Sequence, residues 1–156
     1  MSVGPTDPRE VAEQGLKRSG MEYIQAIVAG ELPAPPISEL MDFRLVVAEP
    51  GRAVFEMQPG PQHYNPIGSV HGGVALTLLD SAMGCAVHTL LDAGVGYTTL
   101  EVKTNFVRPI TSDTGVIRCE GNVIHQGSRI ATAEGKLTDA NGKLLAHGTT
   151  TCLILQ

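Results

Sequence analysis

The sequence has few aromatic residues and few cysteines. It contains three Tyr, three Phe and no Trp, so most of its hydrophobic core must be aliphatic. Its three cysteines, Cys85, Cys119 and Cys152, form no CxxC pair and lack the spacing of a zinc site. We therefore expect reduced thiols in the interior of a cytoplasmic protein rather than a disulfide framework.

Basic residues are also scarce, because 11 Lys and Arg stand against 16 Asp and Glu, for a net charge of −5. No basic stripe is present, which argues against nucleic acid as a main partner. The N-terminus also lacks a basic stretch followed by an apolar one, so we expect no signal peptide. Five His show no metal-ligand spacing, and phosphate-loop and Gly-x-Ser-x-Gly motifs are missing. We predict no metal and no cofactor.

At 156 residues the chain is long enough for one domain. We assign residues 32–156 to that domain and residues 1–31 to a partly flexible N-terminal segment. This segment is polar, with early Pro and Gly, but Ser19 can cap a short helix over residues 21–29. The prolines of residues 32–36 then favour an extended chain.

A long apolar run, residues 74–91, follows a loop that contains Pro66 and Gly68. The run is long enough for a helix of about five turns. Because its apolar residues fall on every side, we expect a buried core helix that Gly94 ends. A membrane span has a similar length, but Asp80 and His88 inside the run argue against one.

The rest of the chain is typical of short strands. Residues 43–48 and 53–57 flank a Pro-Gly turn and predict a hairpin. After the helix, turn signals separate four more strands, which we place at residues 97–107, 114–124, 128–138 and 143–155. One buried helix among five or six mostly antiparallel strands predicts an α+β fold in which the sheet wraps the helix.

Asp80 is the only acid in the apolar run. A lone carboxylate there is destabilising unless it is paired or used. It either pairs with a buried cation, or lies on an exposed stripe of the helix, or acts as a general base or nucleophile.

His71, Gly72 and Gly73 come directly before the helix. The first helical turn has free N–H groups, and glycine lets a carbonyl oxygen approach them, as in an oxyanion hole. The alternative is a tight turn beside a core histidine. Gly73 and Asp80 are seven residues apart and so share a helix face.

The pattern Asn65-x5-His71-Gly72-Gly73-x6-Asp80 resembles the active-site segment of hotdog-fold acyl-CoA thioesterases, in particular the PaaI-like, phenylacetic acid degradation branch. The resemblance extends over residues 32–155 and includes residues 105–109 and the C-terminal hairpin. It implies a hotdog fold, with a curved five- to six-stranded sheet around a long central helix. It also implies an active site at the interface of a homodimer and often a homotetramer, a dimer of dimers.

The same resemblance implies a role for each matched residue. Asp80 would activate water or attack the thioester, and the Gly72 N–H would polarise its carbonyl. His71 and Asn65 would help to orient the carbonyl end of the thioester, and Thr99 would lie near the attacking water. The remaining residues would bind the substrate or its coenzyme A: Gly73, Phe106, Val107, Arg108, Pro109, His125, Gly127, Ser128 and Arg129. Leu76, Leu79 and Met83 are candidates for the floor of an aliphatic pocket.

The expected activity is hydrolysis of an aryl or medium-chain acyl-CoA, with no membrane or nucleic-acid partner. A non-catalytic acyl-CoA sensor on the same fold is one alternative, although residues 1–31 are too short and too weakly basic for a DNA-binding domain. A hotdog dehydratase or hydratase is another, but the two glycines after His71 fit thioester hydrolysis better. A carrier-protein thioester also stays possible as the substrate.

Overall fold

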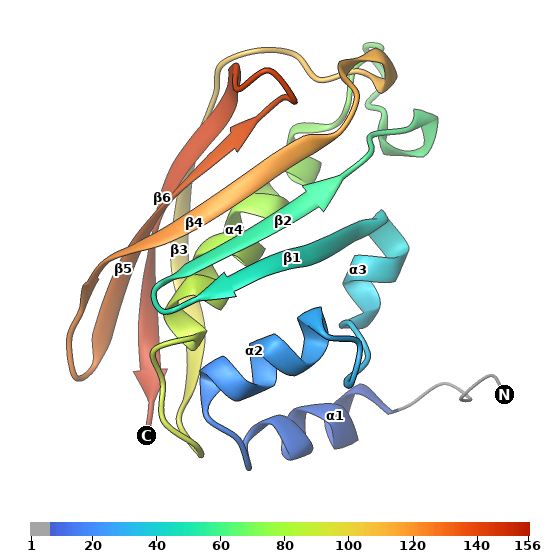
Figure 1. Ribbon diagram of the computed structural model, residues 1–156. Helices are drawn as coiled ribbons and strands as arrows, with labels where there is room; N and C mark the ends of the chain where they lie inside the picture. The colour runs from blue at the N-terminus through green and yellow to red at the C-terminus, as the bar shows by residue number, and fades with distance from the viewer. Residues whose placement is uncertain (1–6) are drawn as a thin grey trace, which may run out of the picture.

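Helix α4 (Gly72–His88) runs through the centre of the fold, and a six-stranded antiparallel sheet curves around it (Figure 1). The computed structural model describes residues 7–156. The six strands lie in the sheet in the order β1-β2-β4-β5-β6-β3, which leaves β1 and β3 at the edges. The predicted α+β hotdog architecture is confirmed. The strands are β1 (Phe43–Glu49), β2 (Arg52–Met57), β3 (Gly96–Phe106), β4 (Ile117–Gln126), β5 (Ile130–Thr138) and β6 (Leu144–Leu155).

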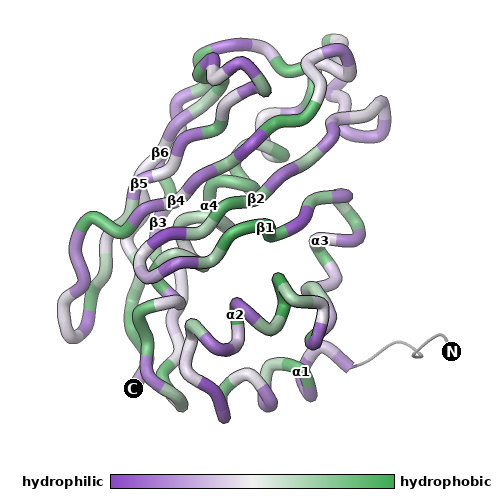
Figure 2. Tube along the Cα trace, viewed as in Figure 1, coloured by the Kyte–Doolittle hydropathy of each residue, from purple (hydrophilic) through white to green (hydrophobic). Residues whose placement is uncertain are grey.

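The predicted first hairpin is formed by β1 and β2, which pair from Phe43 opposite Met57 to Glu49 opposite Arg52. Along the strands, hydrophobic residues alternate with hydrophilic ones (Figure 2). In β5, for example, Ala133 and Leu137 are buried while Glu134 and Lys136 are exposed. Strand β4 begins three residues later than predicted, because a 3-10 helix, η2 (Ser112–Thr114), precedes it. A second one, η1 (Pro61–His63), lies before α4.

One face of α4 packs on the sheet with almost no space between them. Leu78, Leu79, Ala82 and Met83 have no exposed surface. A Cβ atom at Gly121 of β4 would overlap the carbonyl group of Ala82. Glycine at this strand position therefore sets how closely the helix approaches the sheet.

The opposite face of α4 is left open by its own sheet. Leu76 is 38% exposed, and Thr77, Asp80 and Ser81 are half-buried. The expectation that α4 is buried on all sides is therefore wrong. On this face, exposed Leu76 lies among polar residues.

Helix α4 also ends earlier than predicted. Its last residue is His88, and Thr89 follows as the C-cap. The Thr89 hydroxyl donates to the Ala86 carbonyl (2.6 Å) and accepts from the Gly51 N–H (2.8 Å). Gly94 does adopt a left-handed conformation (φ 83°), but in the loop after the helix.

Three helices precede the sheet: α1 (Pro8–Gly15), α2 (Gly20–Val28) and α3 (Pro36–Met41). Helix α2 matches the predicted one, with a Ser19–Glu22 capping box, whereas α1 was not predicted. Gly20 N–H donates to the Leu91 carbonyl (2.9 Å), which ties α2 to the end of α4. These contacts hold part of the segment expected to be flexible; its first six residues lie outside the described range.

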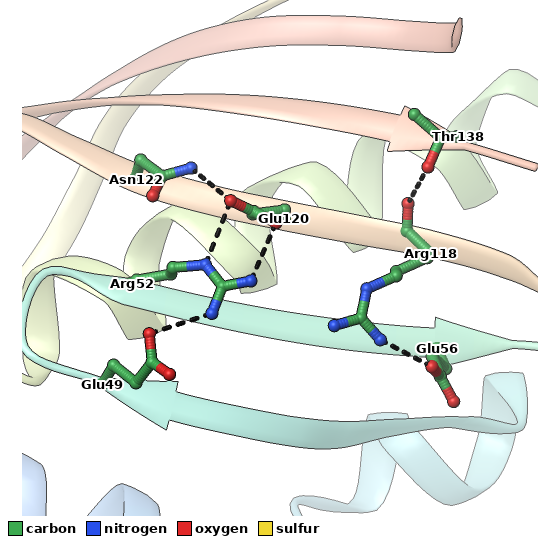
Figure 3. Close-up of polar contacts among 7 residues, drawn as sticks. All are labelled: Glu49, Arg52, Glu56, Arg118, Glu120, Asn122 and Thr138. Atoms are coloured by element: carbon green, nitrogen blue, oxygen red, sulfur yellow. Dashed lines mark hydrogen bonds and ion pairs between the residues drawn. The ribbon is translucent and has the colours of Figure 1, made fainter. Parts of the chain in front are cut away.

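The outer face of the sheet, away from α4, carries a network of ion pairs across β1, β2 and β4 (Figure 3). Arg52 makes two hydrogen bonds to Glu120, both 3.0 Å, and one to Glu49 (2.9 Å). Arg118 pairs with Glu56 at 2.8 Å. Hydrogen bonds from Arg52 are the main cause that lowers the pKa of Glu120 to about 2. Over β1, β2 and β4 this face is therefore charged and suited to water.

We expect Gly121→Ala to destabilise the protein, because its methyl group must displace the backbone of α4. Overpacking of this kind costs about 1–3 kcal/mol. Gly96→Ala is the matched control, since its Cβ would lie 3.9 Å from the nearest heavy atom that surrounds it. Thermal unfolding measures both. Equal melting temperatures for the two variants would contradict the close packing at Gly121.

Candidate active site

His71 is the N-cap of α4, and its ring is fixed by the helix it caps. The Gly73 N–H donates to His71 Nδ1 at 2.8 Å, and the Val74 N–H donates to the His71 carbonyl at 2.9 Å. Because Nδ1 accepts, a neutral imidazole carries its proton on Nε2. That N–H is then a donor at the exposed end of the side chain.

Gly72 is the first residue of α4, and its N–H has no acceptor within residues 7–156. It lies at the positive end of the helix dipole. The ring of Phe106 covers this position, because a Cβ on Gly72 would be 3.1 Å from Phe106 Cζ. The absence of a side chain keeps this N–H accessible between His71 and Phe106.

Asn65 organises the loop before His71. Its Oδ1 accepts from the N–H groups of Ile67 (3.0 Å) and Ser69 (3.2 Å), and its Nδ2 donates to Ser69 Oγ (3.1 Å). The amide is therefore held inside its own loop. Its observed contacts shape the entrance to α4, and an orienting role toward a substrate stays a prediction.

These groups surround a cavity of about 320 Å³, which we call the Gly72 cavity. It lies between the N-terminus of α4 and the end of β3. Seven of its lining residues were predicted as site residues: Asn65, His71, Gly72, Phe106, Val107, Arg108 and Pro109.

Asp80 lines a second cavity, of about 220 Å³, which we call the Asp80 cavity. The Thr99 hydroxyl donates to Asp80 Oδ1 at 2.9 Å, so one carboxylate oxygen is held and the other is free of this bond. No cation pairs with Asp80 within residues 7–156, so the alternative of a buried ion pair is excluded there. The cavity is lined by Pro35, Ile37, Ser38, Phe43, Phe55, Asp80, Ser81, Cys85, Tyr97 and Thr99.

Two groups beside Asp80, Cys85 and Tyr97, are partly buried and have raised pKa values. Burial, and secondarily the charge of Asp80, raises the pKa of Cys85 to about 12. Burial also raises the pKa of Tyr97 well above its usual value. Asp80 thus lies on the wall of a partly enclosed cavity, where a carboxylate acts more strongly on an occupant than it would in bulk water.

Gly72 and Asp80 are eight residues apart on one rigid helix, about 12 Å along its axis at 1.5 Å per residue. Gly73 and Asp80 do share the open face of α4, as predicted. However, the groups around Gly72 and those around Asp80 line different cavities. A single chain therefore cannot place both against one carbonyl group.

His125 lies near the end of β4, and Gly127, Ser128 and Arg129 form the turn that joins β4 to β5. Gln126 Nε2 donates to the carbonyl of Leu90, just after the C-terminal end of α4 (3.4 Å). The turn is thus at the opposite end of α4 from Gly72. Within one chain, this turn therefore lies apart from residues 106–109, the other segment predicted to bind coenzyme A.

Sequence reasoning missed the walls of the Asp80 cavity. Leu79 and Met83, expected in its floor, instead pack toward Gly135 of β5, and Leu76 lines neither cavity. The aromatic residues Phe43, Phe55 and Tyr97 are there in their place. The inward positions of alternating strands mark them as buried, but no sequence signal groups them around Asp80.

Neither a membrane-crossing helix nor a metal site is present among residues 7–156. No helix there is long and apolar enough to cross a membrane. No three His, Cys, Asp or Glu side chains come together there as metal ligands.

Comparisons with known proteins agree with this arrangement. The profile of the thioesterase superfamily matches residues 67–146, about half of the chain. The chain belongs to the thioesterase superfamily. Human acyl-coenzyme A thioesterase 13 is 31% identical over 105 residues, which cover 67% of this chain and 74% of that protein. This chain is accordingly a hydrolase of that superfamily, with acyl-CoA thioesterases among its relatives.

Solved structures support the same fold. A phenylacetic acid degradation-related protein of Ralstonia eutropha JMP134 has a TM-score of 0.76 and 26% identity, over 84% of this chain and 98% of that one. The PaaI protein of the E. coli phenylacetic acid degradation operon also has a TM-score of 0.76, with 19% identity over 88% and 97% of the two chains. This member of the thioesterase superfamily thus has PaaI proteins among its structural neighbours.

The three thiols should resist alkylation, since Cys119 and Cys152 are buried and Cys85 is partly buried. Burial is the main cause that raises the pKa of Cys85, Cys119 and Cys152, so little thiolate is present at pH 8. We expect iodoacetamide to modify none of the three in the folded protein within an hour and all three in denaturant. Mass spectrometry counts the adducts. Rapid labelling of Cys85 in the folded protein would contradict the raised pKa of its thiol.

Proposed function

We propose that this chain hydrolyses acyl-CoA thioesters at a site that two copies of the chain share. The observation that carries the proposal is the division of the catalytic groups between two cavities. Thioester hydrolysis needs a carboxylate base or nucleophile and a donor for the developing oxyanion. Asp80 supplies the first and the Gly72 N–H the second, about 12 Å apart within one chain.

In the proposed reaction, the thioester carbonyl oxygen accepts a hydrogen bond from the Gly72 N–H, with His71 Nε2–H beside it. Asp80 takes a proton from water while the water oxygen bonds to the carbonyl carbon. The C–S bond then breaks, and the coenzyme A sulfur leaves and receives the proton. Alternatively, Asp80 attacks the carbonyl carbon itself, and water hydrolyses the resulting anhydride. In both versions Thr99 holds Oδ1, so that Oδ2 is available to react.

The coenzyme A end is assigned to the Gly72 cavity. Its wall contains Phe106, Val107, Arg108 and Pro109. Arg108 Nη1 donates to the Leu144 carbonyl at 2.6 Å, which fixes the guanidinium at the exposed rim. Its remaining N–H groups can bind a phosphate of the carrier.

Strand β3 offers the surface for the second copy. It is an edge strand of 11 residues, and an unpaired edge of that length is a template for another strand. Leu100 (55% exposed) and Phe106 (60%) lie on it, and Leu76 (38%) lies on the open face of α4. Antiparallel pairing of two β3 strands would cover all three residues.

Helix α4 and strand β3 require the same two-fold axis between the two copies. If Gly72 of one α4 faces Asp80 of the partner's antiparallel α4, the two-fold axis passes the midpoint, Leu76. On β3, Thr99 contacts Asp80 and Phe106 contacts Gly72. Their midpoint lies between residues 102 and 103, so one axis satisfies both pairs. The partner's β4–β5 turn, residues 125–129, then approaches the Gly72 cavity from the other side.

The acyl group belongs in the Asp80 cavity, and an aryl or medium-chain acyl-CoA is the expected substrate. Further association of dimers into tetramers stays a prediction. The outer face is charged over β1, β2 and β4, so a second interface on that part of it would consist of polar contacts rather than an apolar core.

The direct test is Asp80→Asn, which keeps the shape of the side chain and removes its charge. We expect kcat for thiol release from aryl and medium-chain acyl-CoAs to fall about 100-fold or more. Asp92→Asn is the control, because Asp92 is an exposed acid just beyond the same helix. Equal activity in wild type and Asp80→Asn would refute the assignment of Asp80.

A further inference from the structure

Three residues of α4 lie in a row that leads from the Asp80 cavity to the C-terminal end of the helix. Asp80, Gly84 and His88 are spaced four residues apart, so each lies about 6 Å along the helix from the next. A Cβ atom at Gly84 would lie 2.8 Å from the Tyr97 hydroxyl oxygen and 3.1 Å from Tyr97 Cε2. The ring of Tyr97, from β3, therefore covers Gly84, between Asp80 and His88.

Strand β3 contacts this row at two neighbouring points. The Thr99 hydroxyl donates to Asp80 Oδ1, and two residues earlier Tyr97 covers Gly84. Two residues of a strand span about 6.6 Å, close to the length of the helical turn between Asp80 and Gly84. The two contacts therefore fit the same alignment of β3 along α4.

The backbone of β3 is irregular directly after Thr99. Its pairing with β6 shifts in register between Thr99 and Glu101. A bulge of this kind disrupts the strand ladder locally and redirects side chains. The orientation of Thr99 toward Asp80 therefore depends on how the residues before the bulge are held, and the packing of Tyr97 on α4 holds them.

Tyr97 is supported in turn by a row of aromatic rings. The ring centroids of His88 and Tyr97 are 5.3 Å apart, and those of Tyr23, in α2, and His88 are 5.5 Å apart. Both pairs are tilted, a favourable arrangement for aromatic rings at this distance. Burial lowers the pKa of His88, so its ring is neutral at neutral pH. The aromatic row Tyr23–His88–Tyr97 thus connects α2 with the wall of the Asp80 cavity.

Tyr23 has a defined position, because both of its neighbouring helices are packed closely. Helix α2 begins beside the C-terminal end of α4 (Figure 1), where a Cβ atom at Gly20 would overlap the His88 carbonyl. A Cβ atom at Gly15 of α1 would lie 2.8 Å from Tyr23 Cε2, so α1 covers that ring. Tyr23 also precedes residues 67–146, the range that matches the superfamily profile.

We propose that Tyr23, His88 and Tyr97 are positioning residues for Asp80. The aromatic row keeps β3 against α4, so that Thr99 holds Oδ1 of the carboxylate and Oδ2 stays directed at the reacting carbonyl carbon or water. This inference rests on the proposed thioesterase function. It adds that α1 and α2 support the active site, although they contribute no group that touches the substrate.

The test measures kcat and KM of full-length variants with benzoyl-CoA and decanoyl-CoA. Tyr23→Ala should lower kcat about 10-fold and change KM less than about twofold, since a misplaced carboxylate slows the chemical step without weakening coenzyme A binding. Tyr23→Phe keeps the ring and should retain the wild-type kcat. Leu16→Ala, a change at a 51% exposed side chain beside α1, is the second control and should also match wild type.

A double-mutant cycle separates positioning from a general loss of stability. Thr99→Ala removes the hydrogen bond through which the aromatic row is proposed to act. In that background, Tyr23→Ala should lower kcat by less than about twofold more. A further loss as large as that in the wild-type background would show that Tyr23 acts by another route and would overturn the inference.

Hydrogen exchange gives a readout that does not need turnover. The peptide that covers residues 96–100 should exchange about 10-fold faster in Tyr23→Ala than in wild type or Tyr23→Phe, because β3 loses its support next to the bulge. Equal exchange in the three proteins, or equal kcat for Tyr23→Ala and Tyr23→Phe, would overturn the positioning role. No turnover of either thioester by folded wild type would instead overturn the proposed function, and the catalytic part of this inference with it.

Discussion

The close packing of α4 on the sheet is the contact on which the rest of the structure depends. Gly121 brings the helix backbone against β4, and the side chains around Leu79 and Met83 fill the space beside it. Once this face is fixed, the opposite face points away from the sheet. Asp80 is on that face, between the two edge strands, where Thr99 of β3 reaches it. The same packing therefore builds the core and presents the carboxylate.

A rigid helix also fixes the distance between its first residue and its middle. The free N–H of Gly72 and the carboxylate of Asp80 are separate features of one chain, and no side-chain rotation joins them. A two-fold axis near Leu76 would make that separation useful. It would place the Gly72 N–H of one chain beside the Asp80 carboxylate of its partner. On this account the dimer is a requirement of the chemistry, and the open β3 edge is the surface that meets the requirement.

Much of this arrangement was predictable from local patterns. Turn residues marked the hairpins, and an acid inside an apolar run marked Asp80. The open face of α4 was not predictable, because residues such as Leu76 that would contact a second copy are as apolar as those of a core. The cavity walls were also missed, since Ile37 of α3, Phe43 of β1 and Tyr97 of β3 lie far apart along the sequence and meet only in the folded chain. The position of residues 125–129 depends on the same long-range geometry.

The measurement that tests the shared site most directly mixes two inactive variants, Asp80→Asn and His71→Ala. In a mixed dimer one site carries both changes and the other carries neither. After subunit exchange at equal concentrations, half of the dimers are mixed, so we predict recovery of about a quarter of wild-type thioesterase activity. Activity that stays at the level of the separate variants, in a sample shown to have exchanged subunits, would contradict a site built from two chains.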